Sequence, residues 1–502
     1  MSEALLFEKD TPGASAAILP PCDVPQRPPG KVIPRALLSE KPPDLPEVSE
    51  VELVRHYTRL AQRNWCVDTT FYPLGSCTMK YSPKRHERLA ALAGFTQAHP
   101  LAGDALSQGL LRLMWELGRY LGEIAGLPNV SLEPAAGAQG ELTGLLMIAA
   151  FYRERDGGGD LFGGETRAAT LARRPSRRNT VLIPDSAHGT NPASAHIAGF
   201  RPVTVASDAR GNVDLEDLAR NLGDTTAALM ITNPNTLGLF DERIGEVVAA
   251  VHRAGALVYL DGANMNALLG LARPGDFGVD LMHFNTHKTF STPHGSGGPG
   301  AGPIACTDAL APFLPVPIVV ERQGAYSLEE NRPFSIGRVH AFCGNVGVLV
   351  RAYAYLRTLG ADGLKRASQH AVLNANYLLA RLRERYDRPY DRPCMHEFVL
   401  SASRQAAKGV RAIDIAKRLL DYGFHPPTIY FPLIVPEALM IEPTETESRQ
   451  TLDAFAEALM AIADEAEKDP ASFAEAPRTT ALSRLDEVAA ARRPNVRWRP
   501  TE

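Results

Sequence analysis

The middle of the chain alternates between short, wholly apolar runs and longer amphipathic segments. A short apolar run is typical of a strand buried on both faces, and apolar residues at steps of three and four are typical of a helix. Strands and helices that alternate in this way predict a largely parallel sheet with helices on both faces. The predicted strands are residues 181–184, 202–206, 227–232, 256–261 and 281–285, and the helices between them are residues 214–222 and 242–254.

Three helices are expected ahead of this sheet. Ser49 and Glu52 match a capping box, in which each side chain satisfies a free main-chain N–H group, and the box opens a helix to about Arg63. Leucines at steps of three and four predict a second helix over residues 105–126. The stretch from Gly137 opens a third helix, which is expected to begin at Gly140.

The pattern changes after Gly344. A long helix is predicted from Val346 to about Arg385. The segments that follow mix short apolar runs with amphipathic stretches, which indicates a smaller α+β domain. We expect strands at residues 397–401 and 428–435, and helices at residues 413–420 and 453–469.

These patterns divide the chain into four parts. Residues 1–48 hold ten prolines, and because proline fixes φ and lacks an N–H donor, we expect an extended arm there. Residues 49–340 form the predicted large domain with a helical N-terminal segment, and residues 341–470 form the small α+β domain. Residues 471–502 are rich in Ala and Arg and are expected to be an irregular tail.

Composition and charge argue against several classes of protein. Lys and Arg number 53 against 57 Asp and Glu, for a formal net charge of −4, so the basic excess of a nucleic-acid-binding protein is missing. No apolar run reaches the length that spans a bilayer, about 18 residues, and the acidic start does not resemble a secretory leader. The six cysteines include no CxxC pair. This spacing argues against a zinc ribbon or a disulfide framework and favours the reducing cytoplasm.

The densest cluster of candidate chemistry is residues 284–303, FNTHKTFSTPHGSGGPGAGP. Its lysine, Lys288, follows a predicted buried strand and precedes a glycine-rich loop. Burial disfavours the charged ammonium, and the neutral amine can form the Schiff base on which pyridoxal phosphate enzymes depend. An isolated lysine would more often lie on the surface, so this interpretation depends on its neighbours.

Other positions could serve the same cofactor. Asp261 ends the predicted strand ALVYLD, where a carboxylate can keep a pyridinium nitrogen protonated. Asn233 follows another strand, and its amide could reach the 3-oxygen of the cofactor. Gly137 and Ala138 open a helix, whose N-terminus favours phosphate. His188 follows the first strand and could stack on a flat ring or move protons. Taken singly, each also fits a structural role. Asp261 could cap a turn and Asn233 could belong to one. Gly137 and Ala138 could open an ordinary helix, and His188 could be a packed histidine.

Two further patterns are set aside. Residues 295–300, GSGGPG, match the dinucleotide-binding pattern G-x-G-x-x-G, but Pro299 and Pro303 forbid the helix that this motif must open. His283 and His287 are four residues apart, which on a helix could bind a metal ion. The segment is instead predicted as a strand and has no carboxylate ligand nearby, so we expect no metal site.

The order of these parts resembles that of fold-type-I pyridoxal phosphate enzymes, which have an α/β large domain and a smaller C-terminal α+β domain. Longer motifs, spread over about residues 50–465, resemble the glycine decarboxylase P-protein family of the glycine cleavage system. Ser82 and Ser296 depart from the family pattern, but neither departure changes Lys288 or Asp261. The motifs are GSCTMK (75–80), EPAAGAQGE (133–141), DSAHGTNPAS (185–194), TNPNTLGLF (232–240), DGANMNA (261–267), HKTFSTPHG (287–295), and CMHEFVLS, DYGFHPPTIYFPLIV and MIEPTETES within residues 394–448.

The resemblance implies an activity, glycine dehydrogenase (aminomethyl-transferring). Glycine would lose CO2, and the remaining aminomethyl group would pass to the lipoyl arm of the H-protein. Lys288 would carry pyridoxal 5'-phosphate, Asp261 would hold its ring nitrogen and His188 would stack on its ring. The candidates for holding the phosphate are Thr286, His287, Gly137 and Ala138.

Chain length adds a partner to this expectation. Single-chain members of the family are about twice as long and carry the lysine in their C-terminal half. A chain of 502 residues that contains the lysine therefore resembles subunit 2 of the split form, expected to pair with subunit 1 as two copies of each in the cytoplasm. Two alternatives stay open: another pyridoxal phosphate enzyme, such as an aminotransferase or a desulfurase, and a non-catalytic partner. Arg338 is no more than a candidate for binding the glycine carboxylate.

Overall fold

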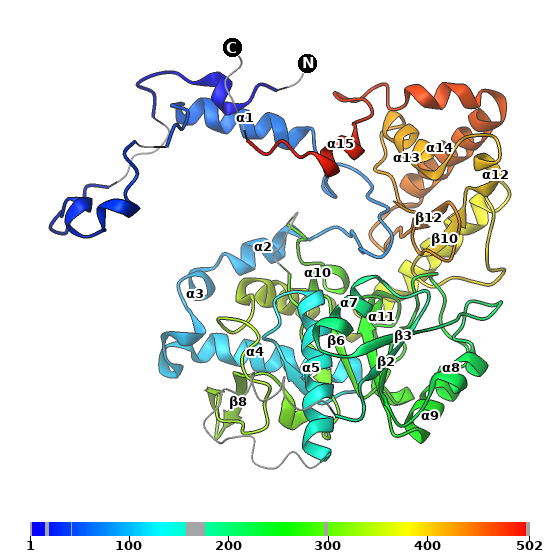
Figure 1. Ribbon diagram of the computed structural model, residues 1–502, viewed down its shortest axis with the longest axis horizontal. Coiled ribbons are helices and arrows are strands. Elements are labelled where there is room, and N and C mark those ends of the chain that lie inside the picture. The colour runs from blue at the N-terminus through cyan, green and yellow to red at the C-terminus, as the bar shows by residue number, and fades with distance from the viewer. Residues whose placement is uncertain (1–2, 16–19, 42, 157–175, 296–299, 498–502) are drawn as a thin grey trace. The chain divides into compact units, whose positions relative to one another are not determined.

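The computed structural model describes residues 3–15, 20–41, 43–156, 176–295 and 300–497 (Figure 1). Two compact units can be recognised, one made of Met1–Thr69 with Pro477–Glu502 and the other of Thr70–Ala476. Within the described ranges, no helix is both long enough and apolar enough to cross a membrane.

A seven-stranded sheet forms the centre of the unit Thr70–Ala476, with strand order β1-β7-β6-β5-β4-β2-β3. Strands β3, β2, β4, β5 and β6 run parallel, and β7 is antiparallel to both β6 and β1. The expected largely parallel sheet is thus present. Its strands are β1 (Asn129–Ser131), β2 (Thr180–Pro184), β3 (Arg201–Val205), β4 (Thr226–Thr232), β5 (Leu257–Gly262), β6 (Leu281–Phe284) and β7 (Ile304–Cys306).

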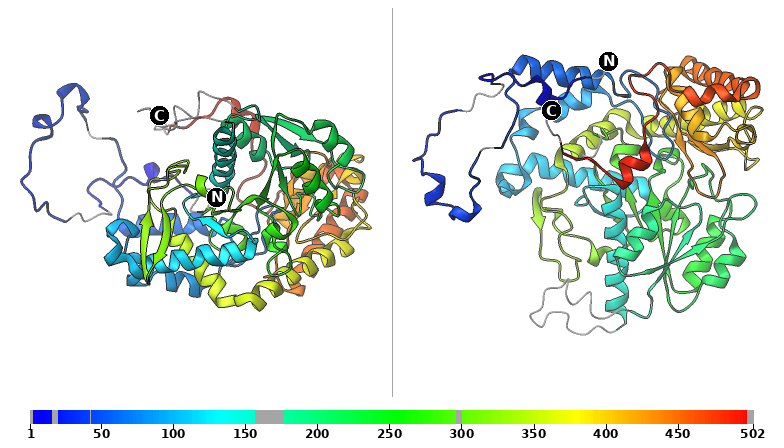
Figure 2. Two further views of the ribbon diagram at one scale, coloured as in Figure 1. Left: turned by 90° about the horizontal axis from the view of Figure 1, so that it is seen from below. Right: turned by 45° about the horizontal axis from the view of Figure 1, so that its top comes forward.

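Helices cover both faces of this sheet (Figures 1 and 2). Leu229 and Leu260 point to the face that packs against α4, α9 and α11, whereas Ala228 and Tyr259 point to the face that packs against α5. Neighbouring residues of one strand are therefore buried on opposite sides, which explains why the strands read as continuous apolar runs. The helices are α4 (Asp104–Ala125), α5 (Gly137–Arg155), α7 (Thr190–Ile197), α8 (Leu215–Asn221), α9 (Ile244–Arg253) and α11 (Val346–Leu382).

The long predicted helix and the third helix differ in detail from expectation. Helix α11 is interrupted at Gly360, which has a φ of 61°. Helix α5 begins at Gly137 and not at Gly140, because Ala136 is the last extended residue. Shorter elements of this unit include α2 (Lys84–Ala90), α3 (Ala93–Thr96), α10 (Thr286–Thr289), the hairpin β8 (Ile318–Arg322) and β9 (Ala325–Glu329), and α12 (Ser403–Ala406).

A three-stranded sheet with order β10-β12-β11 lies in the C-terminal part of the same unit. The predicted strand 428–435 is short, because Tyr430 has a φ of 58° and Pro432 cannot donate to a ladder. Apolar residues of α13 and α14 pack with this sheet in a second core. The elements are β10 (Phe398–Ser401), α13 (Ala412–Asp421), β11 (Thr428–Ile429), β12 (Ala438–Ile441) and α14 (Arg449–Lys468).

The unit made of the two chain ends contains one long helix, α1 (Glu50–Gln62), opened by the predicted capping box of Ser49 and Glu52. The Pro-rich arm holds short 3-10 turns, at Leu6–Lys9, Pro29–Lys31 and Arg35–Leu37. The C-terminal segment, expected to be irregular, contains the short helix α15 (Glu487–Arg492). The division into four domains stays a prediction.

Candidate active site

A pocket of about 530 Å³ opens where β4, β5 and β6 end and where α5 begins. Six of the eight predicted site residues line it, together with residues that had not been predicted. The predicted ones are Gly137, Ala138, His188, Asp261, His287 and Lys288; the others include Tyr72, Ser76, Cys77, Met79, Glu141, Thr190, Thr232, Asn264, Asn285 and His294.

Lys288 belongs to the one-turn helix α10, which follows β6 directly. Its side chain is half-buried and lines the pocket, and its main-chain N–H donates to the carbonyl oxygen of Asn285 at 3.0 Å. The fold therefore brings the amine to the carboxyl ends of the strands, where open α/β sheets place their ligands. Residues 296–299 of the following glycine-rich loop, with Ser296 among them, lie outside the described residues.

Asp261 is the penultimate residue of β5 and lines the same pocket as Lys288; it is almost fully buried, with 4% of its surface exposed. Its Oδ2 accepts a hydrogen bond from Asn191 Nδ2 at 3.0 Å, its Oδ1 accepts one from the Ala263 N–H at 3.0 Å, and His283 Nε2 lies 3.3 Å from Oδ1. Burial alone would raise its pKa. The opposing effects of His283, the Asn191 amide and Lys288 are larger, so the pKa of Asp261 lies below its ordinary value and the side chain is a carboxylate.

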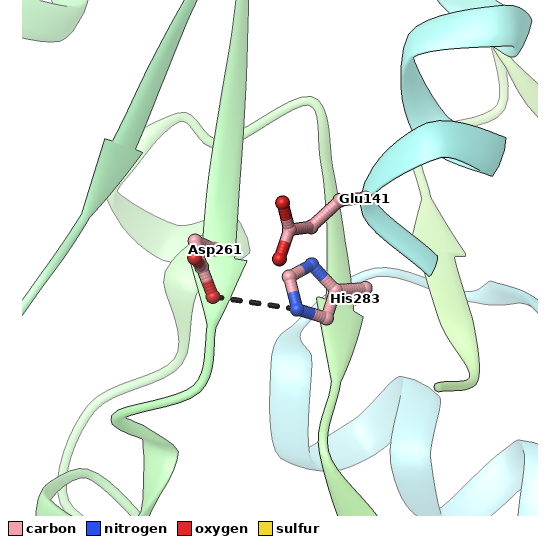
Figure 3. Close-up of side chains that lie close together, drawn as sticks. All are labelled: Glu141, Asp261 and His283. Carbon is pink, nitrogen blue, oxygen red and sulfur yellow. Dashed lines mark ion pairs between the residues drawn. The ribbon is translucent and has the colours of Figure 1, made fainter. Parts of the chain in front are cut away.

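Glu141 forms a second carboxyl group behind Asp261, and the sequence analysis did not single it out. It reaches from α5 toward Asp261 on β5 and His283 on β6 (Figure 3). It accepts hydrogen bonds from Thr190 Oγ1 at 2.9 Å and from Asn191 Nδ2 at 3.2 Å. Burial and the charge of Asp261 raise its pKa to about 7. The Asn191 amide thus joins one ionised carboxylate to one that is partly protonated near neutral pH.

His188 lines the pocket, and its side chain is exposed to solvent. Its Nδ1 lies 2.9 Å from Thr190 Oγ1, and its ring meets that of Phe431 edge to face. Desolvation by these surroundings and the charge of Lys288 lower its pKa. A neutral imidazole at this place is free to lie against a flat ring.

Two predicted residues do not line the pocket. Asn233 is buried, and its Oδ1 accepts a hydrogen bond from the Asp241 N–H at 3.0 Å. Thr286 is fully buried, and its Oγ1 donates to the carbonyl oxygen of Ala301 at 3.3 Å. The two side chains therefore support the loops around the pocket.

The start of α5 provides a cradle for an anion. Gly137 and Ala138 line the pocket at the first turn, and no side chain caps this helix. A Cβ on Gly137 would lie 1.9 Å from Oδ1 of Asn285, so only glycine lets the helix approach the end of β6 this closely. The free N–H groups of such a turn and its dipole favour a phosphate.

Unpaired polar atoms are grouped around the same pocket. Thr232 Oγ1, Asn264 Oδ1, His287 Nδ1 and His294 Nε2 are buried without a hydrogen-bond partner in the described part of the chain. Burial lowers the pKa of His287 to about 3, with further lowering from His294 and Lys288, so its ring is neutral. Because buried polar groups are normally paired, these atoms fit a bound polar ligand. An amine, a buried carboxylate, an uncapped helix start and unpaired polar atoms in one pocket fit pyridoxal phosphate.

Two family models match the chain. Residues 165–322 match the class-V aminotransferase family, and residues 367–480 match the C-terminal domain of glycine dehydrogenase. A relative from Caldanaerobacter subterraneus subsp. tengcongensis is 54% identical over 99% of this chain and 98% of its own length. A relative from Desulforamulus reducens is 54% identical over 100% of both chains. Both carry the name "Probable glycine dehydrogenase (decarboxylating) subunit 2".

The chain belongs to the glycine dehydrogenase (decarboxylating) subunit 2 family. Among solved structures, the inhibitor-bound glycine decarboxylase (P-protein) of the glycine cleavage system has a TM-score of 0.71 at 24% identity, covering 86% of this chain and 93% of that one. This likeness confirms the predicted fold-type-I architecture. The family and the class-V aminotransferase match also confirm pyridoxal phosphate as the predicted cofactor class.

Proposed function

We propose that this chain decarboxylates glycine with pyridoxal phosphate and passes the aminomethyl group to the lipoyl arm of an H-protein. Within this proposal it is subunit 2 of a two-subunit enzyme that works in the cytoplasm. The observation that carries the proposal is the meeting of Lys288 and Asp261 in one pocket, in a chain 54% identical over 99% of its length to a protein named for this activity.

Lys288 and Asp261 would act on different parts of the cofactor. Bound pyridoxal phosphate would supply an electron sink for the electron pair left when the bond between Cα and the carboxyl group of glycine breaks. The Lys288 Nζ would hold the cofactor covalently, release it to glycine, and then accept or return a proton. The Asp261 carboxylate would accept a hydrogen bond from the protonated ring nitrogen, so that the sink keeps its positive charge.

The surrounding residues would fix these two groups. Asn191 and the Ala263 N–H hold both oxygens of Asp261, which leaves its carboxylate few orientations. The pKa of Glu141 is raised to about 7, so this carboxyl group is partly protonated near neutral pH and adds less negative charge beside Asp261 than an ordinary glutamate would. The start of α5 would bind the phosphate, and His188 would cover one face of the ring. Orientation and electrostatics are the protein's contribution to such a reaction.

A cysteine desulfurase is the second candidate, because Cys77 lines the pocket. A desulfurase needs a nucleophilic thiolate on a mobile loop. Burial raises the pKa of Cys77, with Lys288 opposing and Glu442 adding to the effect, so its sulfur is a thiol at neutral pH. This observation favours the glycine reaction.

The partner part of the proposal follows from the names of the relatives. Both are called subunit 2, and the matches cover 98% and 100% of their length. We infer that a subunit 1 pairs with this chain, with two copies of each subunit in the assembly, and that lipoylated H-protein delivers the second substrate.

Two experiments test the proposal. The purified chain should show an absorbance band of lysine-bound cofactor that borohydride bleaches, and peptide mapping should then find the reduced cofactor on Lys288. Label on Lys80, which follows the pocket residue Met79, would show that the anchor has been misassigned. With subunit 1 and lipoylated H-protein added, the chain should exchange labelled bicarbonate into glycine, and turnover of cysteine without glycine exchange would favour the desulfurase.

A further inference from the structure

One wall of the pocket comes from a segment remote in sequence from the large sheet, Leu74–Lys80, and it contributes Leu74, Ser76, Cys77 and Met79 to the lining. We call this segment the wall. Ser76 has a φ of 66° and Thr78 a φ of 46°, in the left-handed region that disfavours residues with a side chain. Two such residues within three positions persist only where surrounding contacts determine the backbone.

Main-chain pairing attaches the start of the wall to the three-stranded sheet. Leu74 forms an antiparallel bridge with Ile441, and the Gly75 N–H donates to the carbonyl oxygen of Met440 at 3.3 Å. A Cβ on Gly75 would lie 2.4 Å from Cγ of Met440, so only glycine permits this approach. The Thr428 hydroxyl donates to the Gly75 carbonyl oxygen at 2.9 Å.

Two buried carboxyl groups hold the two left-handed residues. The Ser76 N–H donates to Oε2 of Glu397 at 2.7 Å, and the Thr78 N–H donates to Oε2 of Glu442 at 2.9 Å. Both glutamates are 0% exposed. The register of the sheet explains why they are neighbours: Phe398 pairs with Ile441, so Glu397 before β10 and Glu442 after β12 lie side by side at the end of the sheet.

The same pair is joined to the loop that follows Asp261. Asn264, which lines the pocket, donates from Nδ2 to Oε1 of Glu397 at 3.1 Å. Glu397 therefore accepts one hydrogen bond from the wall and one from the cofactor side of the pocket. At the far end of the wall, the buried Lys80 donates to Asn266 Oδ1 at 2.7 Å and to Glu445 Oε1 at 2.9 Å.

From these contacts we propose that Glu397 and Glu442 are positioning residues of the active site, whose carboxyl groups fix the wall at Ser76 and Thr78 and so hold Cys77 and Ser76 against the space beside Lys288. The inference rests on the proposed function only in taking this pocket as the active site. The electrostatics of the pair agree with it. Burial and the neighbouring carboxyl group raise the pKa of Glu397 well above its ordinary value, and burial raises the pKa of Glu442 to about 7. The pair therefore retains a proton near neutral pH, and the two groups do not repel each other as two negative charges would.

The experiment uses Cys77 as the reporter of the wall, in the holoenzyme without glycine. Its alkylation by iodoacetamide is followed by peptide mapping, with the buried Cys306 and Cys343 as reporters of general unfolding. Glu442→Leu removes the acceptor of a buried N–H, so Cys77 should react at least about tenfold faster while Cys306 and Cys343 stay protected. Glu442→Gln keeps an oxygen acceptor for the single hydrogen bond that Glu442 accepts from the Thr78 N–H, and should restore the slow rate.

Glu133 provides a matched control. Like Glu442 it is buried and accepts hydrogen bonds from main-chain N–H groups, those of Val339 at 3.2 Å and His340 at 3.4 Å, but it does not contact the wall. Glu133→Leu should leave the alkylation rate of Cys77 unchanged. Equal Cys77 rates in wild type and Glu442→Leu, or the same acceleration in Glu133→Leu, would overturn the proposal.

A measurement on the wild-type holoenzyme covers the case in which Glu442→Leu does not fold. If the two carboxyl groups hold the wall, the main-chain N–H groups of Ser76 and Thr78 exchange with deuterium at least about a hundredfold more slowly than an open loop. Loop-like exchange at both positions would refute the inference. Neither measurement involves glycine, so a failure of the proposed activity and a failure of this inference are distinguishable.

Discussion

Replacing Asp261 by asparagine keeps the shape of the side chain and removes its charge. The carboxylate is 4% exposed and has both oxygens engaged, by Asn191 Nδ2 at 3.0 Å and by the Ala263 N–H at 3.0 Å. The amide NH2 of the variant must face one of these donors, and no negative charge remains to stabilise a protonated ring nitrogen. A hydrogen bond to a charged group contributes about 1.5–3 kcal/mol. We therefore expect the activation free energy of decarboxylation to rise by about 3 kcal/mol, which slows the reaction roughly a hundredfold.

The assay is glycine–bicarbonate exchange by the reconstituted complex, with cofactor content measured on the same sample. Asp280→Asn is the matched control, because Asp280 also lies beside a histidine, His252 Nε2 at 2.9 Å, and also accepts a main-chain hydrogen bond, from Val258 at 2.7 Å. Asp280 precedes β6, at the opposite end of the strands from the pocket. Asp261→Asn should bind cofactor and react slowly, whereas Asp280→Asn should keep its rate. Near-normal exchange by Asp261→Asn would refute the reasoning and make Asp261 a turn cap.

Three further predictions follow from the same structure. Lys288→Ala should lose the borohydride-sensitive band and all measurable exchange, and a variant that retains the band would place the anchor elsewhere. Burial raises the pKa of Glu133 from 4.5 to about 7, so between these pH values the folded protein keeps a proton that the unfolded chain has released. The free energy of unfolding therefore falls as pH rises through this range. Glu133→Gln should make this fall smaller in urea unfolding measured at about pH 5 and about pH 7.5. The chain without subunit 1 should be nearly inactive with H-protein, and a fully active homodimer in solution would contradict the split-enzyme proposal.

Apolar patterning predicted the large sheet well because its strands are buried on both faces. Leu229 packs into the core on one face of the sheet and Ala228 into the core on the other face. Every residue of such a strand is therefore apolar, and the start and end of the apolar run mark the ends of the strand. The start of α5 was placed three residues late. Glycines in its first turn disfavour a helix locally, and close packing of Gly137 on Asn285, which no local pattern records, overrides that preference.

The sequence also indicated that Lys288 and Asp261 lie near each other, since Asp261 ends one apolar strand, Lys288 follows another, and strand ends meet at one edge of a parallel sheet; both line the same pocket. It did not single out Glu141, Glu397 or Glu442. An acidic residue inside a helix or beside a strand is ordinarily exposed. Only contacts between distant segments, such as Ser76 with Glu397 across 321 positions, show that these carboxyl groups are buried and what they hold.

Glycine-dependent exchange of labelled bicarbonate tests the central claim most directly. The measurement combines the purified chain, subunit 1 and lipoylated H-protein, and compares the wild-type chain with Lys288→Ala under the same conditions. The expected result is exchange that requires glycine and every component and that disappears in Lys288→Ala. Absence of exchange with the wild-type chain at full cofactor content, or equal exchange by Lys288→Ala, would contradict the assignment of this pocket to glycine decarboxylation.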